Sequence, residues 1–274
     1  MTTATSTSAP ASALLVETRT AHIEVLTTGS SGPDIVFLHG VLGLEPDSAF
    51  LGALGARARV FAPLLPGYSA APDAPHVRTM LDFTLLMLDV VEALHVNDPI
   101  IVGHCMGGMI AAEMAALAPN EVRRLALIAP LGLWLDDHQI LDVFAMAPSE
   151  IADAWYFDSA GHDLPDLADP VHLESVLIRN ARQLATAGKL LFPIPDRGLS
   201  ARLPRVKAAS LLVWGADDRY VPQVYAGAFR DLLRQSETVV IPNAGHMVIE
   251  EEPEAVARAI AGLFDPISTA GVIA

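Results

Sequence analysis

The chain has 274 residues, of which 52% are apolar and 18% are charged, with a formal net charge of −15 and one cysteine. This length fits one large domain with a sizeable core, and the apolar composition excludes a disordered chain. The negative charge disfavours nucleic acids and anionic membranes as partners, because phosphates would be repelled. One cysteine excludes intramolecular disulfides and cysteine-rich metal sites, and it fits a reducing compartment.

The amino-terminal segment carries no recognisable targeting signal. Residues 1–12 contain no basic residue, and no long apolar stretch follows them. We therefore predict a flexible tail rather than a signal peptide. No uninterrupted apolar run approaches the ~20 residues that span a bilayer. We expect a cytoplasmic protein without a membrane partner.

Strand and helix signals alternate along most of the chain. Residues 13–17 and 22–27 are predicted to form an antiparallel hairpin, and the apolar run 34–38 a strand buried on both faces. Alternation of this kind favours a parallel, doubly wound sheet. Further strands are predicted at 59–62, 99–102, 125–129, 210–214 and 238–241, and helices at 50–54, 79–94, 109–117 and 253–264.

The alternation stops after residue 130. Three helical segments, 140–146, 150–156 and 171–187, are predicted before strand signals resume, with prolines and aspartates between them. We expect residues 131–205 to form a helical lid on a core made of residues 13–130 and 206–274. An insertion at the carboxyl edge of an open parallel sheet covers the crevice where ligands bind. The lid should therefore set substrate choice and contribute little to the fold of the core.

A sharp turn signal surrounds the cysteine. The β-branched run 100–102 ends at Gly103, Cys105 follows one residue later, and Gly107 and Gly108 come next. An apex residue in such a turn is held in a strained backbone conformation, and glycines on either side avoid collisions between strand and helix. Gly103-x-Cys105-x-Gly107 is the cysteine form of the nucleophile elbow.

An acid and a base follow the elbow in chain order. Asp217 and Asp218 come just after the strand that ends at Trp214, and His246 comes after the next strand. In this order of motifs the chain resembles the α/β-hydrolase family, over residues 34–129 and 207–264. The resemblance implies an α/β-hydrolase fold, with a mostly parallel, doubly wound sheet and a helical lid insertion.

The resemblance also implies a catalytic triad. The phrase Trp-Gly-x-x-Asp-x-x-x-Pro, which runs from Trp214 to Pro222, puts the acid at Asp218 and leaves Asp217 as its neighbour. A free cysteine titrates near pH ~8.5, so Cys105 needs a base to become a nucleophile. His246 would take its proton, and Asp218 would fix the histidine tautomer and stabilise the imidazolium.

Two backbone amides are candidates for an oxyanion hole. The amide of Met106 follows the nucleophile at the start of a helix, where the helix dipole favours negative charge. The amide of Val41 belongs to the His-Gly loop after strand 34–38. Losing one donor from such a hole typically costs ~2.7–4 kcal/mol of transition-state stabilisation.

We expect structural roles for the other histidines near the motifs and for most large apolar residues of the insertion. In the resembled family, residues in the positions of His39 and His104 support the loop and the elbow. No cofactor is expected, and no metal, because His138, His162 and His172 lack a common ligand spacing. Most large apolar side chains of the insertion should form its own core, with a minority facing the nucleophile; they are Trp134, Met146, Trp155, Phe157, Leu190 and Phe192.

We therefore predict a hydrolase that cleaves a small, largely apolar ester, thioester or lactone through an acyl-enzyme on Cys105. Dienelactone hydrolases and polyhydroxyalkanoate synthases also use cysteine, but the rest of the chain looks more like lidded esterases and carbon–carbon bond hydrolases of aromatic breakdown. A carbon–carbon hydrolase of a ring-cleavage product, an acyltransferase and a non-catalytic ligand receptor stay open. So do a cysteine engineered in place of serine and the oligomeric state, a homo-oligomer included.

Overall fold

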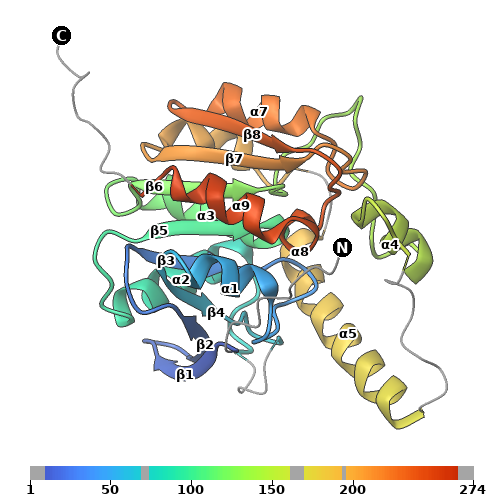
Figure 1. Cartoon of the computed structure of the whole chain (residues 1–274), viewed down its shortest axis with the longest axis horizontal. Helices are drawn as coiled ribbons and strands as arrows, with labels where there is room; N and C mark the ends of the chain where they lie inside the picture. Colours follow the sequence, from blue (N-terminus) through green and yellow to red (C-terminus); the bar gives the residue numbers. More distant parts are fainter. Residues whose placement is uncertain (1–9, 69–73, 161–169, 193–195, 265–274) are drawn as a thin grey trace, which may run out of the picture.

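The computed structural model describes residues 10–68, 74–160, 170–192 and 196–264. In these residues an eight-stranded sheet has the order β1-β2-β4-β3-β5-β6-β7-β8 (Figure 1). The predicted hairpin is present as β1 (Ser12–Glu17) and β2 (His22–Thr28), which pair antiparallel. β2 also pairs antiparallel with β4, and all remaining pairs are parallel. The predicted mostly parallel, doubly wound sheet is confirmed.

The parallel strands coincide with the apolar runs of the sequence to within two residues at each end. In β5, Ile100 and Val102 pack on one face of the sheet and Ile101 packs on the other, as the two-residue period of a strand requires. Burial on both faces explains why the inner strands read as continuous apolar runs. They are β3 (Asp34–Leu38), β4 (Arg59–Pro63), β5 (Ile100–His104), β6 (Arg124–Ile128) and β7 (Ala209–Gly215). The edge strand β8 (Ser236–Ile241) has one buried residue, Ile241.

Helices cover both faces of the sheet (Figure 1). One layer contains α1 (Ala49–Gly55), α8 (Val248–Glu251) and α9 (Pro253–Ala261); the other contains α2 (Met80–Ala93), α3 (Cys105–Leu117) and α7 (Val224–Leu232).

Local signals explain where some of these helices lie. Helix α2 begins where the side chains of Thr79 and Asp82 cap each other's backbone amides. Helix α7 was not predicted, although Tyr225 and Phe229 are both buried and four residues apart, which fits the helical period.

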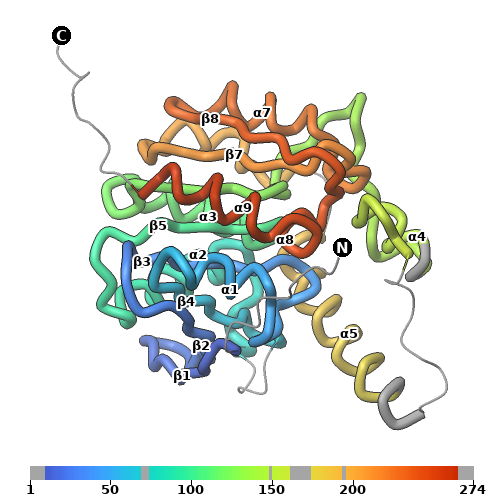
Figure 2. Tube along the Cα trace, viewed as in Figure 1, coloured from blue at the N-terminus to red at the C-terminus, as the bar shows by residue number. Residues whose placement is uncertain are grey.

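The direction in which strands are added reverses beside β3. The chain goes from β3 to β4 on one side and returns to β5 on the other (Figure 2). Ligand sites in open parallel sheets lie outside the carboxyl ends of the strands at such a point. The carboxyl end of β3 leads into loop 39–43, and that of β5 leads into Cys105. The topology alone therefore brings this loop and the cysteine to one crevice.

Residues 131–205, called the insertion below, lie between β6 and β7 and form no strand where they are described. The helices predicted at 150–156 and 171–187 are present as α4 (Pro148–Trp155) and α5 (Pro170–Leu191), followed by α6 (Leu199–Arg202) and a 3-10 turn over Leu203–Arg205. Although α5 has 22 residues, no helix among the described residues combines the length and apolarity needed to span a bilayer.

The helix predicted at 140–146 is absent, so that prediction is wrong. The carboxylate of Asp142 accepts the amide of Phe144 at 3.0 Å, and the carbonyl of Asp142 accepts the amide of Ala145 at 2.9 Å. This local turn competes with helical hydrogen bonds. Pro148 adds to the effect because it disfavours helical dihedrals at the residue before it. Of the predicted segments, residues 1–9, 161–169, 193–195 and 265–274 lie outside the described part of the chain.

Candidate active site

Cys105 occupies the apex of a strained turn between β5 and α3. Its φ angle is +54°, in the left-handed region that side chains other than glycine rarely adopt. A Cβ atom on Gly103 would lie 2.4 Å from the carbonyl oxygen of Gly107, and one on Gly107 would lie 2.1 Å from that of Leu38. The strain predicted for the apex and the need for its two glycines are confirmed.

Asp218 and His246 form a buried hydrogen-bonded pair. The Nδ1 atom of His246 lies 2.9 Å from Oδ2 of Asp218. The other carboxylate oxygen accepts the amides of Tyr220 at 3.0 Å and Val221 at 2.8 Å, which fixes the carboxylate. Asp217 is half-buried, and its carboxylate accepts no hydrogen bond from the residues that the structure describes. The structure thus brings Asp218, and not Asp217, to the histidine.

The second ring nitrogen of His246 is free for a reacting proton. Nε2 is buried and has no hydrogen-bond partner in the described part of the chain. His246 and Cys105 line one small cavity together with Val41 and Trp155. The ring is therefore oriented by Asp218 and lines the cavity that contains Cys105, the placement that proton exchange with the thiol requires.

The charge balance at His246 favours its protonated form. Burial alone would lower the pKa of this histidine, but the negative charges of Asp218 and Cys105 outweigh burial and raise the pKa to about 10. An imidazolium beside a cysteine stabilises the thiolate, which is the nucleophilic form.

Of the two oxyanion candidates, Val41 lies at the cavity of Cys105 and Met106 directly follows the cysteine. The amide of Met106 is in the first turn of α3, where amides have no partner within the helix. Among hydrogen bonds between described residues, neither amide is a donor. A Cβ atom on Gly40 would lie 3.0 Å from Cβ of Cys105, so the 39–43 loop approaches the nucleophile closely.

His39 and His104 are buried, neutral and occupied by backbone contacts. His39 contacts the carbonyl of Gly40 through Nδ1 at 2.8 Å and accepts the amide of Leu65 at Nε2 at 3.0 Å. Nε2 of His104 donates to the carbonyl oxygen of His246 at 2.9 Å. Burial lowers the pKa of His39 to about 4 and is the largest cause that lowers that of His104 to about 3. Both contacts agree with the structural role predicted for these residues.

The histidines of the insertion belong to no metal cluster that the structure describes. No group of three His, Cys, Asp or Glu side chains among the described residues could hold a metal ion. His138 is exposed, His162 lies outside the described residues, and the side chain of His172 is not described.

Two aromatic side chains that the sequence motifs did not indicate lie around His246. The ring of Tyr220 is 4.8 Å from the imidazole and that of Trp155 is 6.2 Å from it, with 5.7 Å between the two aromatic rings. Tyr220 lies two residues after Asp218, a signal that could have found it. Trp155 was assigned to the core of the insertion, and no sequence signal linked it to Cys105.

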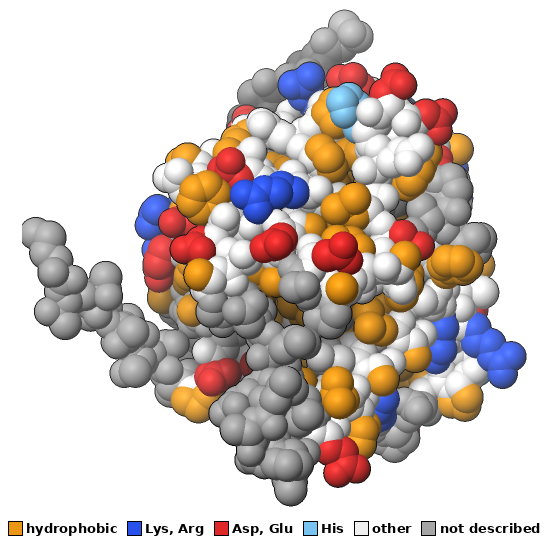
Figure 3. All heavy atoms as spheres, turned by 90° about the vertical axis from the view of Figure 1, so that its right-hand side faces the viewer, with side chains coloured by type: hydrophobic (Ala, Val, Ile, Leu, Met, Phe, Trp, Pro, Cys, Tyr) orange, Lys and Arg blue, Asp and Glu red, His pale blue; other side chains and the backbone are white. Residues whose placement is uncertain are grey.

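Trp155 is buried, as the core prediction has it, but that prediction is wrong for Phe157 and Phe192, which are 41% and 57% exposed. On the side of the molecule that carries α4 and α5, apolar side chains are interspersed with acidic and basic ones (Figure 3). The insertion therefore buries part of its aromatic surface against the triad loops and leaves part of it in solvent.

The end of α4 is hydrogen-bonded to the loops that carry Asp218 and His246. A guanidinium nitrogen of Arg219 donates to the carbonyl of Asp153 at 2.8 Å. The amide of Met247 donates to the carbonyl of Trp155 at 3.0 Å. These contacts argue against the expectation that the insertion contributes little to the core.

Glu251 makes a further connection between the two regions. Its carboxylate accepts the amide of Phe157 and the amide of Gly245, each at 2.6 Å. One side chain thus joins the segment after α4 to the loop that carries His246. Hydrogen bonds to a charged acceptor are stronger than neutral ones, so Glu251 is a firm link.

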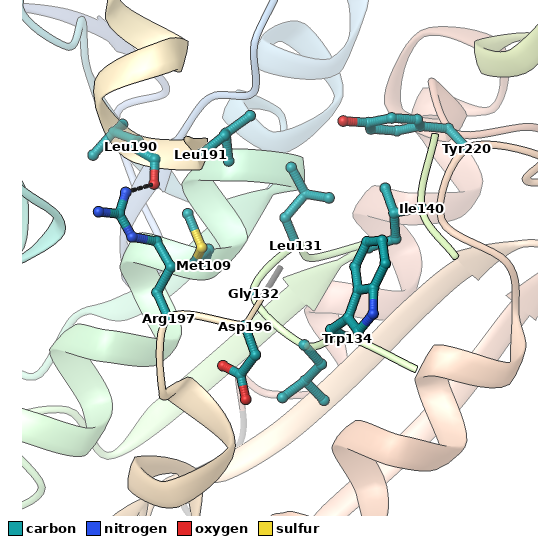
Figure 4. Close-up of a pocket in the computed structure, with 11 residues that line it drawn as sticks. Met109, Leu131, Gly132, Trp134, Ile140, Leu190, Leu191, Asp196, Arg197 and Tyr220 are labelled. Carbon is teal, nitrogen blue, oxygen red and sulfur yellow. Dashed lines mark hydrogen bonds between the residues drawn. The ribbon is translucent and has the colours of Figure 1, made fainter. Parts of the chain in front are cut away.

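A second, mostly apolar pocket is lined by Tyr220, by Met109 of α3 and by residues of the insertion (Figure 4). Met109 is one turn along α3 from Cys105, so this pocket begins ~6 Å along the helix axis from the nucleophile. Arg197 is at the edge of the pocket and donates to the carbonyl of Leu190 at 2.7 Å. The apolar lining consists of Met109, Leu131, Gly132, Leu133, Trp134, Ile140, Leu190, Leu191 and Tyr220.

The fold and these motifs agree with a comparison of protein families. Residues 35–259 match the model of the Alpha/beta hydrolase family. The chain belongs to this family. The predicted class, an α/β-fold hydrolase, is thereby confirmed.

Relatives of this hydrolase carry several names. It is 30% identical over 83% of its length to the dihydrolipoyllysine-residue acetyltransferase component of the acetoin cleaving system of Pseudomonas putida, and it spans 62% of that protein. It is 27% identical over 81% of its length to the pimeloyl-[acyl-carrier protein] methyl ester esterase of Aromatoleum aromaticum, of which it spans 94%. A solved membrane phospholipase A superposes with a TM-score of 0.76 and 25% identity, covering 94% of this chain and 88% of the other.

Proposed function

We propose that this hydrolase cleaves a small, largely apolar ester, thioester or lactone through a cysteine acyl-enzyme. Cys105 is the nucleophile, His246 the base and Asp218 the acid that orients the base. The observation that carries the proposal is the Asp218–His246 hydrogen bond, which leaves Nε2 unpartnered at the cavity that contains Cys105. A ligand receptor has no need of this arrangement, whereas nucleophilic catalysis requires all three groups.

The reaction proceeds in two halves. The Cys105 thiolate attacks the substrate carbonyl carbon, and the amides of Val41 and Met106 hydrogen-bond the oxygen as it becomes an oxyanion. The tetrahedral intermediate collapses as the protonated His246 gives its proton to the leaving oxygen or sulfur, which leaves a thioester on Cys105. His246 then takes a proton from water, hydroxide attacks the thioester, and the acid product departs as the thiolate re-forms.

The apolar pocket that Tyr220 lines is the proposed site for the acyl group. Its side chains come from both the core and the insertion, with Met109 from α3 and Leu190 from α5. An apolar wall excludes water from the acyl-enzyme and favours a hydrocarbon chain over a charged one. The names of the relatives, an esterase and a phospholipase among them, support a carboxylic ester as the substrate class.

Ester turnover and alkylation test the proposal together. The protein should hydrolyse p-nitrophenyl butyrate, and iodoacetamide should abolish this activity with one adduct, because Cys105 is the only cysteine. Full activity in stoichiometrically alkylated protein would refute the cysteine nucleophile. Binding of the ester without turnover would indicate a receptor, and faster consumption of an aromatic ring-cleavage product would indicate a carbon–carbon hydrolase.

A further inference from the structure

The three tryptophans of the chain differ in what their indole N–H groups bind. Nε1 of Trp214 donates to the carbonyl of Val221 at 2.8 Å, and Nε1 of Trp134 donates to the carboxylate of Asp136 at 3.0 Å. Nε1 of Trp155 is buried and has no hydrogen-bond partner among the described residues. The unpartnered donor is thus the one in the tryptophan that lines the cavity of Cys105.

An unpartnered indole N–H at this position requires an explanation. Trp155 is 3% exposed, so bulk water does not compensate its donor. Buried tryptophans usually find an acceptor, and leaving a buried donor unpaired is unfavourable. An acceptor that arrives with a ligand would remove this penalty only in the complex.

The indole is held firmly beside the reacting groups. Its backbone carbonyl accepts the amide of Met247, the residue after His246, and Glu251 ties the next peptide, through the amide of Phe157, to the histidine loop. Its ring packs against Tyr220 and His246. The donor is therefore pre-positioned relative to the base, which favours binding because little ordering is left to the ligand.

We propose that Trp155 is a specificity-determining residue whose Nε1–H donates a hydrogen bond to a second oxygen of the substrate, close to the scissile carbonyl. This inference rests on the proposed function for the identity of the scissile bond. The preferred substrates are then acyl compounds with an ether, keto or hydroxyl oxygen near the reacting carbon, not plain hydrocarbon esters. A site with a buried donor discriminates against an analogue that lacks the acceptor, because the donor stays unpaired.

Matched ester pairs test the proposal by turnover. Each pair consists of a p-nitrophenyl ester and its isostere with oxygen in place of one methylene: butyrate with methoxyacetate, pentanoate with 3-methoxypropanoate, and hexanoate with 4-methoxybutanoate. Trp155→Phe keeps an aromatic ring and removes the donor. It should lower kcat/KM about three- to tenfold for at least one oxygen-containing ester, the worth of one neutral hydrogen bond. The all-carbon partner should change less than twofold.

Trp214→Phe is the matched control, because it removes an indole N–H whose acceptor belongs to the protein, and Trp214 lines neither of the two cavities. It should change both members of each pair by the same factor. An equal loss across all pairs in Trp155→Phe would overturn the proposal and leave Trp155 a packing residue.

Binding and unfolding provide readouts that do not need turnover. In a Cys105→Ala background, calorimetry should show that Trp155→Phe weakens binding of the methyl ester of the selected oxygen-containing acid and not of its all-carbon isostere. Equal binding changes would overturn the inference even if all esters are hydrolysed, whereas a selective loss without any turnover would refute only the proposed function.

Trp155→Phe should lower the urea midpoint less than Trp214→Phe does, because both variants lose a similar volume of buried ring and only Trp214→Phe also loses an internal hydrogen bond. Trp214→Phe should unfold at a lower urea concentration, because it leaves the carbonyl of Val221 without its donor. A fall in Trp155→Phe as large as that in Trp214→Phe, without ester selectivity, would assign Trp155 a structural role alone.

Discussion

The carboxyl edge of the core and the insertion above it meet at His246, but their side chains are held there in different ways. In the core, Asp218 is fixed by the amides of Tyr220 and Val221, two and three residues away. In the insertion, Trp155 is fixed by partners some 90 residues later in the chain, Met247 among them. The proposed acid is thus held by local backbone contacts, and the indole proposed to contact the ligand is held by contacts with distant residues.

This difference teaches where a sequence carries functional information. A strained turn needs glycines at fixed offsets, so the elbow is visible as a motif. A contact between remote segments leaves no such pattern, because many residue types can fill one gap. Five predictions test the contrast, from the largest expected effect to the smallest.

Removing the nucleophile should have the largest effect. Cys105→Ala is expected to lower kcat for ester hydrolysis roughly 10³- to 10⁶-fold, as loss of a triad nucleophile does elsewhere. Cys105→Ser should keep measurable activity, because His246 can also activate a hydroxyl. Stopped-flow and steady-state assays of the three proteins measure this. An alanine variant within tenfold of wild type would assign the chemistry to another group.

Replacing the proposed acid should have the second-largest effect. Asp218→Asn should lower kcat by about 10⁴-fold, because the amide no longer fixes the tautomer of His246 or stabilises its charged form. Asp217→Asn is the matched control, and its kcat should change less than threefold because the carboxylate of Asp217 makes no contact with the histidine in the described structure. The reverse ranking, with both variants folded by circular dichroism, would move the acid by one residue.

The link between the two regions should matter for stability. Glu251→Ala leaves the amides of Phe157 and Gly245 without their acceptor and should lower the free energy of unfolding by about 1–3 kcal/mol. Glu252→Ala, one residue on and exposed, should change it by less than about 0.5 kcal/mol. Urea titrations of both variants measure the difference. Equal effects would mean that the insertion is held by other contacts.

The sequence predicted the features that local residues determine and did not predict those that depend on distant contacts. The inner parallel strands were predicted because burial on both faces gives them continuous apolar runs, and Cys105, Asp218 and His246 were predicted as motifs after strand ends. The helix prediction for 140–146 was wrong because the side chain of Asp142 competes with helical hydrogen bonds. The spacing of apolar residues does not indicate such a competing turn. Trp155 was missed because only its distant contacts bring it to the site.

The apolar pocket that Tyr220 lines should control acyl selectivity. Leu190→Ala enlarges it and should shift the ratio of kcat/KM between hexanoate and acetate esters by about 1–3 kcal/mol, the worth of a methylene-scale change. Phe192→Ala is a control from the same segment, since its side chain is 57% exposed and does not line the pocket. A larger shift in the control would place the acyl group outside this pocket.

The last prediction concerns two buried histidines at the carboxyl edge of the core, His104 and His246, whose pKa values are shifted in opposite directions. His104 has its pKa lowered to about 3, mainly by burial, so it is neutral in the folded protein at pH 5 while the unfolded chain would bind a proton. The free energy of unfolding therefore decreases as pH falls from about 6.5 towards 3, because protonation of His104 favours the unfolded chain. His246 has the opposite sign: its pKa is raised to about 10, so its contribution is complete below pH 6.5 and is lost as pH rises towards 10.

His104→Gln separates these contributions, because glutamine keeps an N–H donor for the carbonyl of His246 and does not titrate. Between pH 6 and pH 4.5 the free energy of unfolding of the variant should fall less steeply than that of wild type, by about 1.4 kcal/mol per pH unit. The alkaline loss from His246 should persist. His138→Gln, an exposed control, should follow the wild-type curve. If the free energy of unfolding fell as steeply with pH in His104→Gln as in wild type, His104 would already be charged in the folded protein. Burial would then separate the pKa values of His104 and His246 less than their contacts imply.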